Sequence, residues 1–458
     1  MPIKSLQLTE KPVILILTEF LKEVTNLTVQ EKIKAKTRTV EELLAMVPDG
    51  AVICNAGTGF QGFYAKLHTI ADRLTKPVTV YGYAGGKDNA YYWDDQYKDK
   101  FFTTSEFFGK PLRDRHPAGT VSLIPLHLHA FMDRFLDVYK PNIYILGTTM
   151  VDRHGYVRTP LSCPSRRAID MADIVIACVN PLAPIVYGDT EISIDDIDYI
   201  VEEANPINTF EPGPLTDVDR AIGENVATLV EDGSTIQLGI GAIPDAVAQA
   251  FMTKKDLGIH TEMITSSMAD LCLAGVVNGS KKTLHRGKLV GGFASGNQKL
   301  VDYLTENPSV YLMPLEYTNH PAVVAQNYKM CSINTCIEVD LTGQVASESI
   351  GPMQFSGSGG QNDTGEGAIH CPGGKSIIAF ASAITKKDGT RVSKIKSVLT
   401  PGAIVTLSRN NIDYLVTEYG IAPMKARPIR QRVDNLIAIA HPDFREELRA
   451  EANKLMLW

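Results

Sequence analysis

The stretch that decides the fold is Asp232-Gly233-Ser234-Thr235-Ile236-Gln237-Leu238-Gly239-Ile240-Gly241-Ala242-Ile243-Pro244-Asp245. Its β-branched start predicts a strand, and the glycines that follow predict a tight turn. Pro244 is a favourable first helical residue, so the turn is expected to open a helix there. A strand, a glycine turn and a helix start place backbone N–H groups where they can hold an anionic group.

The same pattern occurs earlier in the chain. Residues 49–54 and the glycines of 56–59 parallel residues 232–241, and an apolar-periodic helix is predicted before each copy, at 40–47 and 221–230. A second echo pairs 152–157 with 340–345, and a third pairs 172–176 with 412–416. The offset between the copies drifts, so insertions separate them. The chain is therefore predicted to contain two similar halves.

Each half alternates short β-rich runs with helical patterns, which is the signature of βαβ units on a parallel sheet. The break between the halves falls at residues 205–214, where prolines and a glycine resist both helix and sheet. We therefore predict an α/β fold with two domains, residues 1–210 and 211–458. Within the first domain, residues 1–35 are expected to be an extension, and the sequence assigns it no role.

The composition of the chain argues against some classes of binding partner. A net charge of −7 over 458 residues argues against broad contact with nucleic acid. No apolar run approaches the ~18–20 residues that would span a bilayer, so no membrane partner is expected. The 7 cysteines form no CxxC pair, and they lie at positions 54, 163, 178, 272, 331, 336 and 371. Neither a disulfide framework nor a structural zinc site is indicated, and a reducing cytoplasm is the predicted location.

Glu262 is the first candidate for chemistry. It lies in Gly258-Ile259-His260-Thr261-Glu262-Met263, about twenty residues after the glycine turn. A carboxylate in an apolar, β-prone segment can be a nucleophile, a general base or a helix-capping acid, and the residues alone leave all three open. A second glycine cluster at 355–363 can supply another close backbone approach.

These segments carry a resemblance to a known family. The matching strings, in order along the chain, are residues 239–247, 258–263, 319–321, 359–361, 417–422 and 441–444. They resemble the acetyl-CoA hydrolase/transferase family, and within it the 4-hydroxybutyrate and butyrate:acetate CoA-transferases. The resemblance covers roughly residues 180–450. It implies two similar α/β CoA-transferase domains, with the active site in the cleft between them.

The resemblance also implies a mechanism. Glu262 would attack the thioester of an acyl-CoA, giving a mixed anhydride that CoA then opens to a glutamyl-CoA thioester. A small carboxylic acid would reverse these steps. The backbone N–H groups of Ile243 and Gly360 would hold the oxyanion. Coenzyme A, the cosubstrate, would be bound by Gly239, Ile240, Gly241, Ala242, Ile243, Ile337 and Gly360. A homodimer or larger homo-oligomer is common among such enzymes.

Other residues leave structural and functional alternatives open. His320, beside Pro321, and Glu418 are candidates for the site or for local structural roles. Cationic and imidazole groups suit a dicarboxylate such as succinate or itaconate, namely Arg113, Arg115, His129, Arg166 and Arg167. Phosphates could meet Lys255, Lys281, Lys282 and Arg286, although most such charges are solvated. His127 and His129 invite a metal interpretation, but no fitting ligands accompany them and no metal is predicted.

Two further functions remain open on the residues. An acyl-CoA hydrolase would use water in place of the second acid. A non-catalytic module that binds CoA or a dinucleotide would use the glycine turns alone, although the full GxGxxG spacing is absent from the 239 turn.

Overall fold

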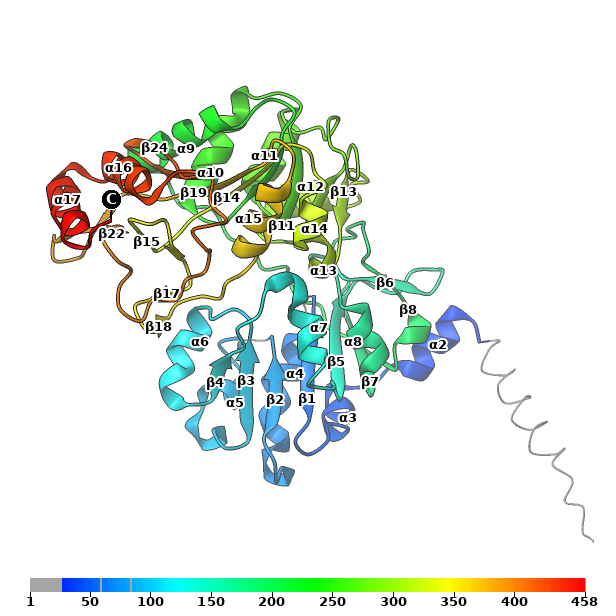
Figure 1. Ribbon diagram of the computed structural model, residues 1–458. Helices are drawn as coiled ribbons and strands as arrows, with labels where there is room; N and C mark the ends of the chain where they lie inside the picture. Colours follow the sequence, from blue (N-terminus) through cyan, green and yellow to red (C-terminus); the bar gives the residue numbers. More distant parts are fainter. Residues whose placement is uncertain (1–26, 58–59, 83–84, 458) are drawn as a thin grey trace, which may run out of the picture.

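The computed structural model describes residues 27–57, 60–82 and 85–457. The chain forms two α/β parts, one built from the N-terminal half and the other from the C-terminal half (Figure 1). Within the described ranges, no helix has both the length and the apolar composition needed to cross a membrane.

The N-terminal half contains a 7-stranded parallel sheet, in the order β4-β3-β2-β1-β5-β7-β9. Its strands are β1 (Val52–Ala56), β2 (Val78–Tyr81), β3 (Phe101–Ser105), β4 (Val121–Leu123), β5 (Ile143–Thr148), β7 (Ile174–Val179) and β9 (Tyr199–Glu202). The helices of this half are α2 (Val29–Lys36), α3 (Val40–Ala45), α4 (Gln61–Lys66), α5 (Ala90–Trp93), α6 (Lys110–Arg115), α7 (Phe131–Leu136) and α8 (Arg166–Met171).

The C-terminal half contains an 8-stranded sheet, in the order β13-β12-β11-β10-β14-β19-β23-β24, in which only β24 runs antiparallel to its neighbour. The strands are β10 (Thr235–Leu238), β11 (Gly258–Ile264), β12 (Leu289–Ala294), β13 (Val310–Leu312), β14 (Met330–Asn334), β19 (Lys375–Ala379), β23 (Tyr414–Thr417) and β24 (Gly420–Pro423). The helices are α9 (Asp217–Leu229), α10 (Ala242–Ala250), α11 (Ser266–Leu273), α12 (Gln298–Leu304), α13 (Leu315–Thr318), α14 (Pro321–Val324), α15 (Gln361–His370), α16 (Ile429–Ile439) and α17 (Arg445–Lys454).

Small ladders and 3₁₀ helices complete the described part of the chain. The paired strands are β6 (Tyr156–Arg158) with β8 (Glu191–Ser193), β17 (Ser349–Ile350) with β18 (Met353–Gln354), and β20 (Ala383–Thr385) with β21 (Arg391–Ser393). A three-stranded ladder joins β15 (Glu338–Asp340), β16 (Val345–Ala346) and β22 (Ile395–Lys396). The 3₁₀ helices are η1 (Leu67–Arg73), η2 (Asp95–Tyr97), η3 (His116–Ala118), η4 (Leu128–Ala130), η5 (Ile194–Asp196), η6 (Phe251–Thr253) and η7 (Pro442–Phe444).

The two halves share one topology, which confirms the predicted α/β fold with two similar parallel sheets. In each sheet the first four strands run outward in one direction, and the chain then returns to add the later strands on the other side of the first strand. The reversal falls between β1 and β5 in one sheet and between β10 and β14 in the other. The first sequence echo is confirmed, because 49–54 and 232–237 lead into β1 and β10, which hold equivalent places. The domain boundary near 210 stays a prediction.

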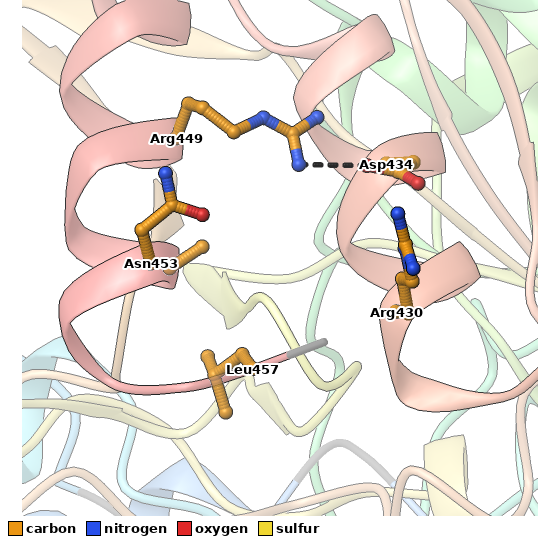
Figure 2. A pocket seen from close by; sticks show the side chains of 6 residues that line it. Arg430, Asp434, Arg449, Asn453 and Leu457 are labelled. Atoms are coloured by element: carbon orange, nitrogen blue, oxygen red, sulfur yellow. Dashed lines mark ion pairs between the residues drawn. The ribbon is translucent and has the colours of Figure 1, made fainter.

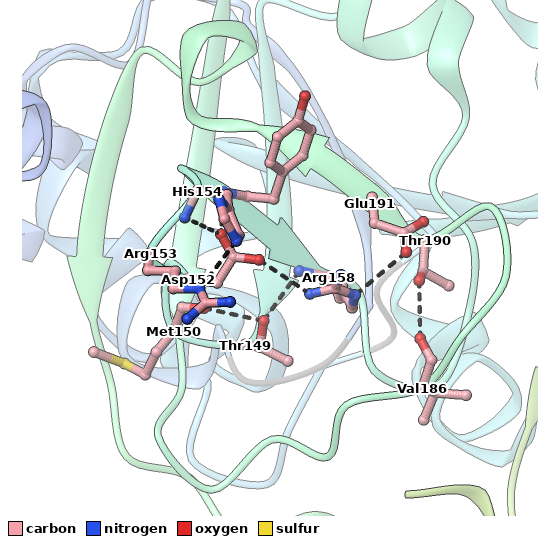
Figure 3. Close-up of polar contacts among 10 residues, drawn as sticks. Thr149, Met150, Asp152, Arg153, His154, Arg158, Val186, Thr190 and Glu191 are labelled. Carbon is pink, nitrogen blue, oxygen red and sulfur yellow. Dashed lines mark hydrogen bonds and ion pairs between the residues drawn. The ribbon is translucent and has the colours of Figure 1, made fainter. Parts of the chain in front are cut away.

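The second echo is also confirmed, as a turn built twice. Asp152 Oδ1 accepts the N–H groups of His154 and Tyr156 at 2.8 and 3.0 Å. Asp340 Oδ1 accepts those of Thr342 and Gln344 at 2.9 and 3.0 Å. In the first copy Arg158 lies between the carboxylates of Asp152 and Glu191, at 3.4 and 3.3 Å, and so ties the turn to the β6–β8 ladder (Figure 3).

The third echo was wrong in its pairing. Residues 172–176 lead into β7, but the strand in the equivalent place of the second sheet is β19, while 412–416 lead into β23, the counterpart of β9. The carboxylates at the starts of these strands agree with this assignment. Asp198 accepts the N–H of Val175 at 2.8 Å, and Asp413 accepts the N–H of Ser376 at 3.0 Å. The short apolar strands look alike in sequence, and only their hydrogen-bonded neighbours separate them.

Part of the predicted N-terminal extension lies among the described residues. Residues 1–26 lie outside the described residues, but the rest of the predicted extension belongs to the first α/β part. Helix α2 starts at a capping box between Thr28 and Glu31. Lys32 pairs with Asp195 at 2.7 Å, and Lys36 Nζ donates to the Ile194 carbonyl at 2.7 Å. These contacts hold α2 against the end of the first sheet.

Candidate active site

Glu262 lies on β11, near the carboxyl end of the strand and in the middle of the second sheet. Its strand adjoins β10, and the chain reverses direction in the sheet between β10 and β14. In open parallel sheets ligands bind outside the carboxyl ends of the strands, at such a reversal. Glu262 is therefore placed beside the natural ligand crevice of this half.

The Glu262 carboxylate is held by two donors from distant parts of the chain. Asn319 Nδ2 donates to Glu262 Oε2 over 3.2 Å. The backbone N–H of Gly360, the residue that precedes α15, donates to the same carboxyl group. No side chain caps α15, so the positive end of this helix is open toward the carboxylate.

Glycine is required at position 360 by space. A Cβ there would lie 2.2 Å from Glu262 Oε2 and 2.0 Å from Asn319 Nδ2. Both distances are far inside van der Waals contact, so any larger residue would displace the carboxylate or its amide partner. The close backbone approach predicted for the second glycine cluster is confirmed at this position.

The surroundings of Glu262 shift its ionisation. Burial, with a smaller contribution from the negative charge of Asp363, raises the pKa of Glu262 to about 7. The hydrogen bonds from Asn319 and Gly360 act in the opposite direction, because they favour the ionised form. A carboxylate with this pKa is partly ionised at neutral pH and poorly solvated, which suits a nucleophile.

A buried polar network fixes the start of α15. Thr364 Oγ1 donates to the Gly360 carbonyl at 2.9 Å and accepts a hydrogen bond from the Ser332 hydroxyl at 2.9 Å. Ser332 is also 3.0 Å from Gln237 Oε1, and the amides of Gln237 and Asn334 are paired at 3.2 Å. The network links the carboxyl ends of β10 and β14 to the helix turn that carries Gly360. It therefore holds the backbone donor in place.

The glycine segment 355–360 is clamped by the N-terminal half. Ser358 Oγ donates to the Leu126 carbonyl at 3.1 Å. A Cβ at Gly357 would lie 2.1 Å from the Glu106 carbonyl oxygen, so the two backbones pack directly together. Arg113 donates to the Phe355 carbonyl and lies over its ring, 4.2 Å from the centroid.

The first turn of α15 makes a further contact with the N-terminal half. Asp363 is fully buried and accepts both the backbone N–H and the Nδ1 of His129, each at 2.9 Å. This hydrogen bond raises the pKa of His129. The His129 ring also lies 5.0 Å from the ring of His320. Groups from both halves of the chain therefore surround the segment that holds Glu262.

The first glycine turn forms an open helix start. Gly241 has φ +111°, a conformation that favours glycine, and α10 begins at Ala242. Pro244 is thus the third helical residue rather than the predicted first, a place where a missing N–H still costs nothing. No side chain caps α10, and Ile240 is 57% exposed. The N–H groups of Ala242 and Ile243 therefore point out of the helix start without a capping side chain.

The remaining predicted CoA residues lie at neighbouring strand ends. Gly239 follows β10 and donates its N–H to the Ile333 carbonyl at 2.9 Å, and a Cβ there would meet Asn334 Oδ1 at 3.2 Å. Ile337 is half-buried in the segment that leaves β14, with its N–H on the Ala346 carbonyl at 2.9 Å. These places suit a ligand running across β10 and β14, and the assigned roles stay predictions.

In Asn319-His320-Pro321 the residue that reaches Glu262 is Asn319, which the sequence analysis did not name. Asn319 is fully buried and contacts Glu262, whereas His320 is exposed and its Nδ1 accepts the Ala322 N–H at 3.2 Å. His320 thus has the alternative structural role of capping the turn before α14. Glu418 is similar, since it accepts the backbone N–H and the hydroxyl of Ser382 at 2.9 and 2.6 Å.

Most of the predicted cations are engaged elsewhere. Three arginines pair with carboxylates of their own half at 2.7 Å, namely Arg115 with Asp95, Arg166 with Asp196 and Arg167 with Asp137. Lys282 is buried and donates to the carbonyls of Ile259 and Lys288 at 2.7 and 2.9 Å, and burial lowers its pKa to about 7. Exposed positions are taken by Lys255, Lys281 and Arg286.

The imidazoles of His127 and His129 are stacked with centroids 5.9 Å apart. Over the described part of the chain, no three His, Cys, Asp or Glu side chains are grouped as metal ligands. The expectation of no metal stays a prediction.

A separate hollow of about 270 Å³ lies between α16 and α17 (Figure 2). Its lining includes the ion pair of Arg449 with Asp434 at 2.7 Å. The lining residues are Arg430, Asp434, Arg449, Ala452, Asn453 and Leu457. It contains none of the residues predicted to act in the site.

Comparison with known protein families supports the same resemblance. Residues 28–211 match the N-terminal domain of the acetyl-CoA hydrolase/transferase family, and residues 296–452 match its C-terminal domain. Glu262 lies between the two matched ranges.

Individual relatives agree with the family match. The 4-hydroxybutyrate coenzyme A transferase of Clostridium kluyveri is 45% identical over 350 residues, which are 76% of this chain and 81% of the relative. A probable butyrate:acetyl-CoA coenzyme A-transferase of Syntrophomonas wolfei is 40% identical, over 73% of this chain and 76% of the relative. The crystal structure of RipA from Yersinia pestis superposes with a TM-score of 0.88 at 30% identity, covering 94% of this chain and 100% of that one.

The chain therefore belongs to the acetyl-CoA hydrolase/transferase family. It is an enzyme, a CoA-transferase, as the resemblance of its sequence strings implied.

Proposed function

We propose that the enzyme transfers CoA from an acyl-CoA to a small carboxylic acid through a thioester between CoA and the Glu262 side chain. The observation that carries this is the Glu262 carboxylate at the open start of α15, with Gly360 and Asn319 donating to it. A surface carboxylate would be well solvated and a poor nucleophile. The Glu262 carboxylate is half-buried and oriented by two donors, so it is less solvated and better placed to attack than a surface carboxylate.

The steps balance in bonds and charge. One carboxylate oxygen of Glu262 adds to the acyl-CoA carbonyl, the C–S bond breaks, and CoA leaves as a thiolate. The thiolate then adds to the glutamyl carbonyl of the mixed anhydride and expels the first carboxylate. The second carboxylic acid repeats the sequence in reverse and leaves as its CoA thioester. Each half exchanges one acyl bond for another, so no redox partner is needed.

The contacts assign different roles to the two oxygens of the Glu262 carboxylate. Asn319 donates to Oε2, and the backbone at Gly360 also faces this oxygen. Oε1 is then the atom that attacks, while Oε2 becomes the oxyanion when CoA adds to the glutamyl carbonyl. Donors already aimed at that oxygen stabilise the charge as it develops. For the first addition, at the acyl-CoA carbonyl, we assign the N–H of Ile243 together with that of Gly360.

We assign CoA to the crevice at the ends of β10 and β14. The uncapped start of α10 supplies N–H groups and a positive dipole for an anionic cosubstrate. Gly239 and Gly241 lack side chains that would narrow the turn, and Ile337 supplies an apolar wall nearby.

For the acid, we favour a small monocarboxylate, and 4-hydroxybutyrate is the first to test because a relative acts on it. The dicarboxylate alternative needs a free cation at the site. Arg115, Arg166 and Arg167 have local carboxylate partners, and Arg113 is held on Phe355. His129 is the one member of that predicted set beside the site, and its Nδ1 is taken by Asp363.

The cell context is also a proposal. All 7 cysteines carry free thiols, which suits a reducing cytoplasm. We expect a homodimer or larger homo-oligomer on the family resemblance alone, and sedimentation of the full chain measures it.

The proposed function is tested by measuring whether CoA release depends on an acceptor acid, and by removing the Glu262 nucleophile. With acyl-CoA alone the enzyme should release little CoA, and added 4-hydroxybutyrate, butyrate or acetate should give the matching new thioester with ping-pong kinetics. Glu262→Ala should lose transfer by at least 10⁴-fold while keeping its fold, since residual catalysis would come from binding alone. Steady CoA release without an acid would identify a hydrolase instead. Binding of CoA without either reaction would identify a binding module.

A further inference from the structure

We propose that His260 is a positioning residue for the nucleophile, acting through Thr318 and Asn319 to keep the Asn319 amide on the Glu262 carboxylate. The proposal rests on the proposed function, because it takes Glu262 as the nucleophile. It concerns a side chain that neither reacts nor touches the reacting atoms.

His260 and Glu262 lie two residues apart on β11, so their side chains leave the same face of the sheet. The His260 side chain is fully buried. Its Nε2 is 2.8 Å from the Thr318 carbonyl oxygen. A carbonyl only accepts hydrogen bonds, so Nε2 carries the proton and donates.

The second link passes from Thr318 to Asn319. The Thr318 hydroxyl lies 3.2 Å from Asn319 Oδ1 and 3.3 Å from the Pro314 carbonyl, and is shared between these acceptors. A donor at Oδ1 fixes which end of the amide faces which way. The Nδ2 end is then aimed at Glu262 Oε2, 3.2 Å away. The chain of bonds starts and ends on one strand, β11.

Two features of the fold explain why such a tie is needed. Helix α13 has only 4 residues, and no side chain caps its start at Pro314. A single helical turn is not stable without outside contacts. Gly292 of β12 leaves the space in which this end sits, since a Cβ there would be 3.0 Å from Thr318 Oγ1 and 3.1 Å from the Glu262 carbonyl.

The donor is also kept in one protonation state. Burial lowers the pKa of His260 to about 3, and the nearby charge of Lys282 acts in the same direction. Within the described residues His260 Nδ1 has no hydrogen-bond partner. The neutral tautomer with the proton on Nε2 is therefore the one that the site uses, and its bond to Thr318 persists across the working pH range.

The test compares His260→Phe with His260→Gln. Phenylalanine fills the space without a donor, whereas the Gln amide keeps an N–H near the Nε2 position. We expect His260→Phe to lower kcat by about 10–100-fold, the effect of a misplacement near 1 Å, with KM for acyl-CoA nearly unchanged. His260→Gln should recover most of that rate. His285→Phe is the matched control, because His285 bonds the Tyr317 hydroxyl of the same helix at 2.7 Å rather than the Thr318 carbonyl, and so removes a contact to α13 without breaking the chain of bonds to the Asn319 amide.

A double-mutant cycle separates positioning from general loss of packing. If His260 acts through Asn319, then His260→Phe should cost nothing further in an Asn319→Ala background. The acid limb of the kcat/KM pH profile should move to higher pH in His260→Phe, as it should in Asn319→Ala. Thr318→Val breaks the middle link at constant volume, and gives the same test if His260→Phe does not fold.

The outcomes separate this inference from the function on which it rests. If Glu262→Ala retained transfer, Glu262 would not be the nucleophile, and both the proposed function and the positioning role of His260 would be wrong. An inactive Glu262→Ala together with full kcat in His260→Phe and Thr318→Val would overturn the positioning role alone. So would losses that add to that of Asn319→Ala, because additive losses mean that the two residues act separately.

Discussion

The Glu262 carboxylate and the Gly360 backbone lie so close that position 360 has no room for a side chain. A Cβ at 360 would stand 2.2 Å from Glu262 Oε2. The strand that presents the carboxyl group and the helix start that receives it are nearly one hundred residues apart in the chain. Much of the chemistry proposed for the enzyme depends on this one approach.

Gly360→Ala should therefore lower kcat by at least 100-fold while the protein stays folded. The added methyl group displaces either Glu262 or Asn319, and a misplacement near 1 Å costs about that much. Steady-state kinetics measure the loss, and thermal unfolding checks the fold. Gly213→Ala is the matched control, since a Cβ there meets nothing within 4 Å. Equal activity in the two variants would mean that the close approach is not used in catalysis.

The rate should depend on pH through Glu262. Its raised pKa, to about 7, means that the ionised nucleophile appears only as the pH rises through neutrality. We expect an acid limb in kcat/KM with an apparent pKa near 7. Asn319→Ala should move this limb to higher pH, because the amide favours the ionised form. A limb at the ordinary carboxyl pKa, unmoved in the variant, would contradict the assignment.

Asp363→Asn should move the same limb the other way. The Asp363 charge raises the pKa of Glu262, so its removal lowers that pKa and extends activity to lower pH. The change also weakens the bond with His129 between the halves of the chain. A pH profile of the variant, measured below its unfolding temperature, decides the sign. An upward shift would show that lost structure outweighs lost charge.

Glu262→Gln should stabilise the protein at alkaline pH. A carboxyl whose pKa is raised by folding contributes stability below its unfolded pKa, near 4.5, and loses it as the pH rises through about 7. The neutral amide avoids this loss. At pH 8 to 9 we expect a gain on the order of 1–3 kcal/mol over the native protein, vanishing near pH 4. Unfolding in urea at the two pH values measures it, and a pH-independent difference would contradict it.

Thr364→Val should weaken both stability and rate. Valine keeps the volume but leaves Ser332 and the Gly360 carbonyl without the Thr364 hydroxyl. Ser332 keeps Gln237 as a partner and the Gly360 carbonyl keeps the Thr364 N–H, so each hydrogen bond lost costs about 0.5–1.5 kcal/mol, and the start of α15 loses its side-chain tie to β14. Thermal unfolding and kcat report the two effects. Loss of stability with an unchanged kcat would show that the network supports the core but does not place Gly360.

The elements that carry the site were predictable because each has a local signature. Gly241 needs a positive φ, and glycine turns after β-branched runs mark strand ends before helices. The repeated carboxylate turns at Asp152 and Asp340 were visible as a spacing. Glu262 was singled out by its place after the glycine turn and by the family strings.

Most of the misses are matters of contact between distant segments. Asn319 and His320 are neighbours in the sequence, and only the fold shows which of them faces Glu262. Arg115, Arg166 and Arg167 were candidates to bind a dicarboxylate, and their carboxylate partners 20 or more residues away could not be read from the chain. The start of α2 has a local signature that the sequence analysis did not use, the capping box of Thr28 and Glu31, whereas the contact of Lys32 with Asp195 spans 163 residues.

The central claim is that Glu262 carries CoA during turnover, and one measurement tests it most directly. The full chain is incubated with acyl-CoA, reduced with borohydride, and analysed by intact mass and peptide mapping. We predict a CoA-sized adduct before reduction, and Glu262 as its alcohol afterwards, with neither in Glu262→Gln. An adduct on another residue, or full transfer with no adduct at any time, would contradict the account.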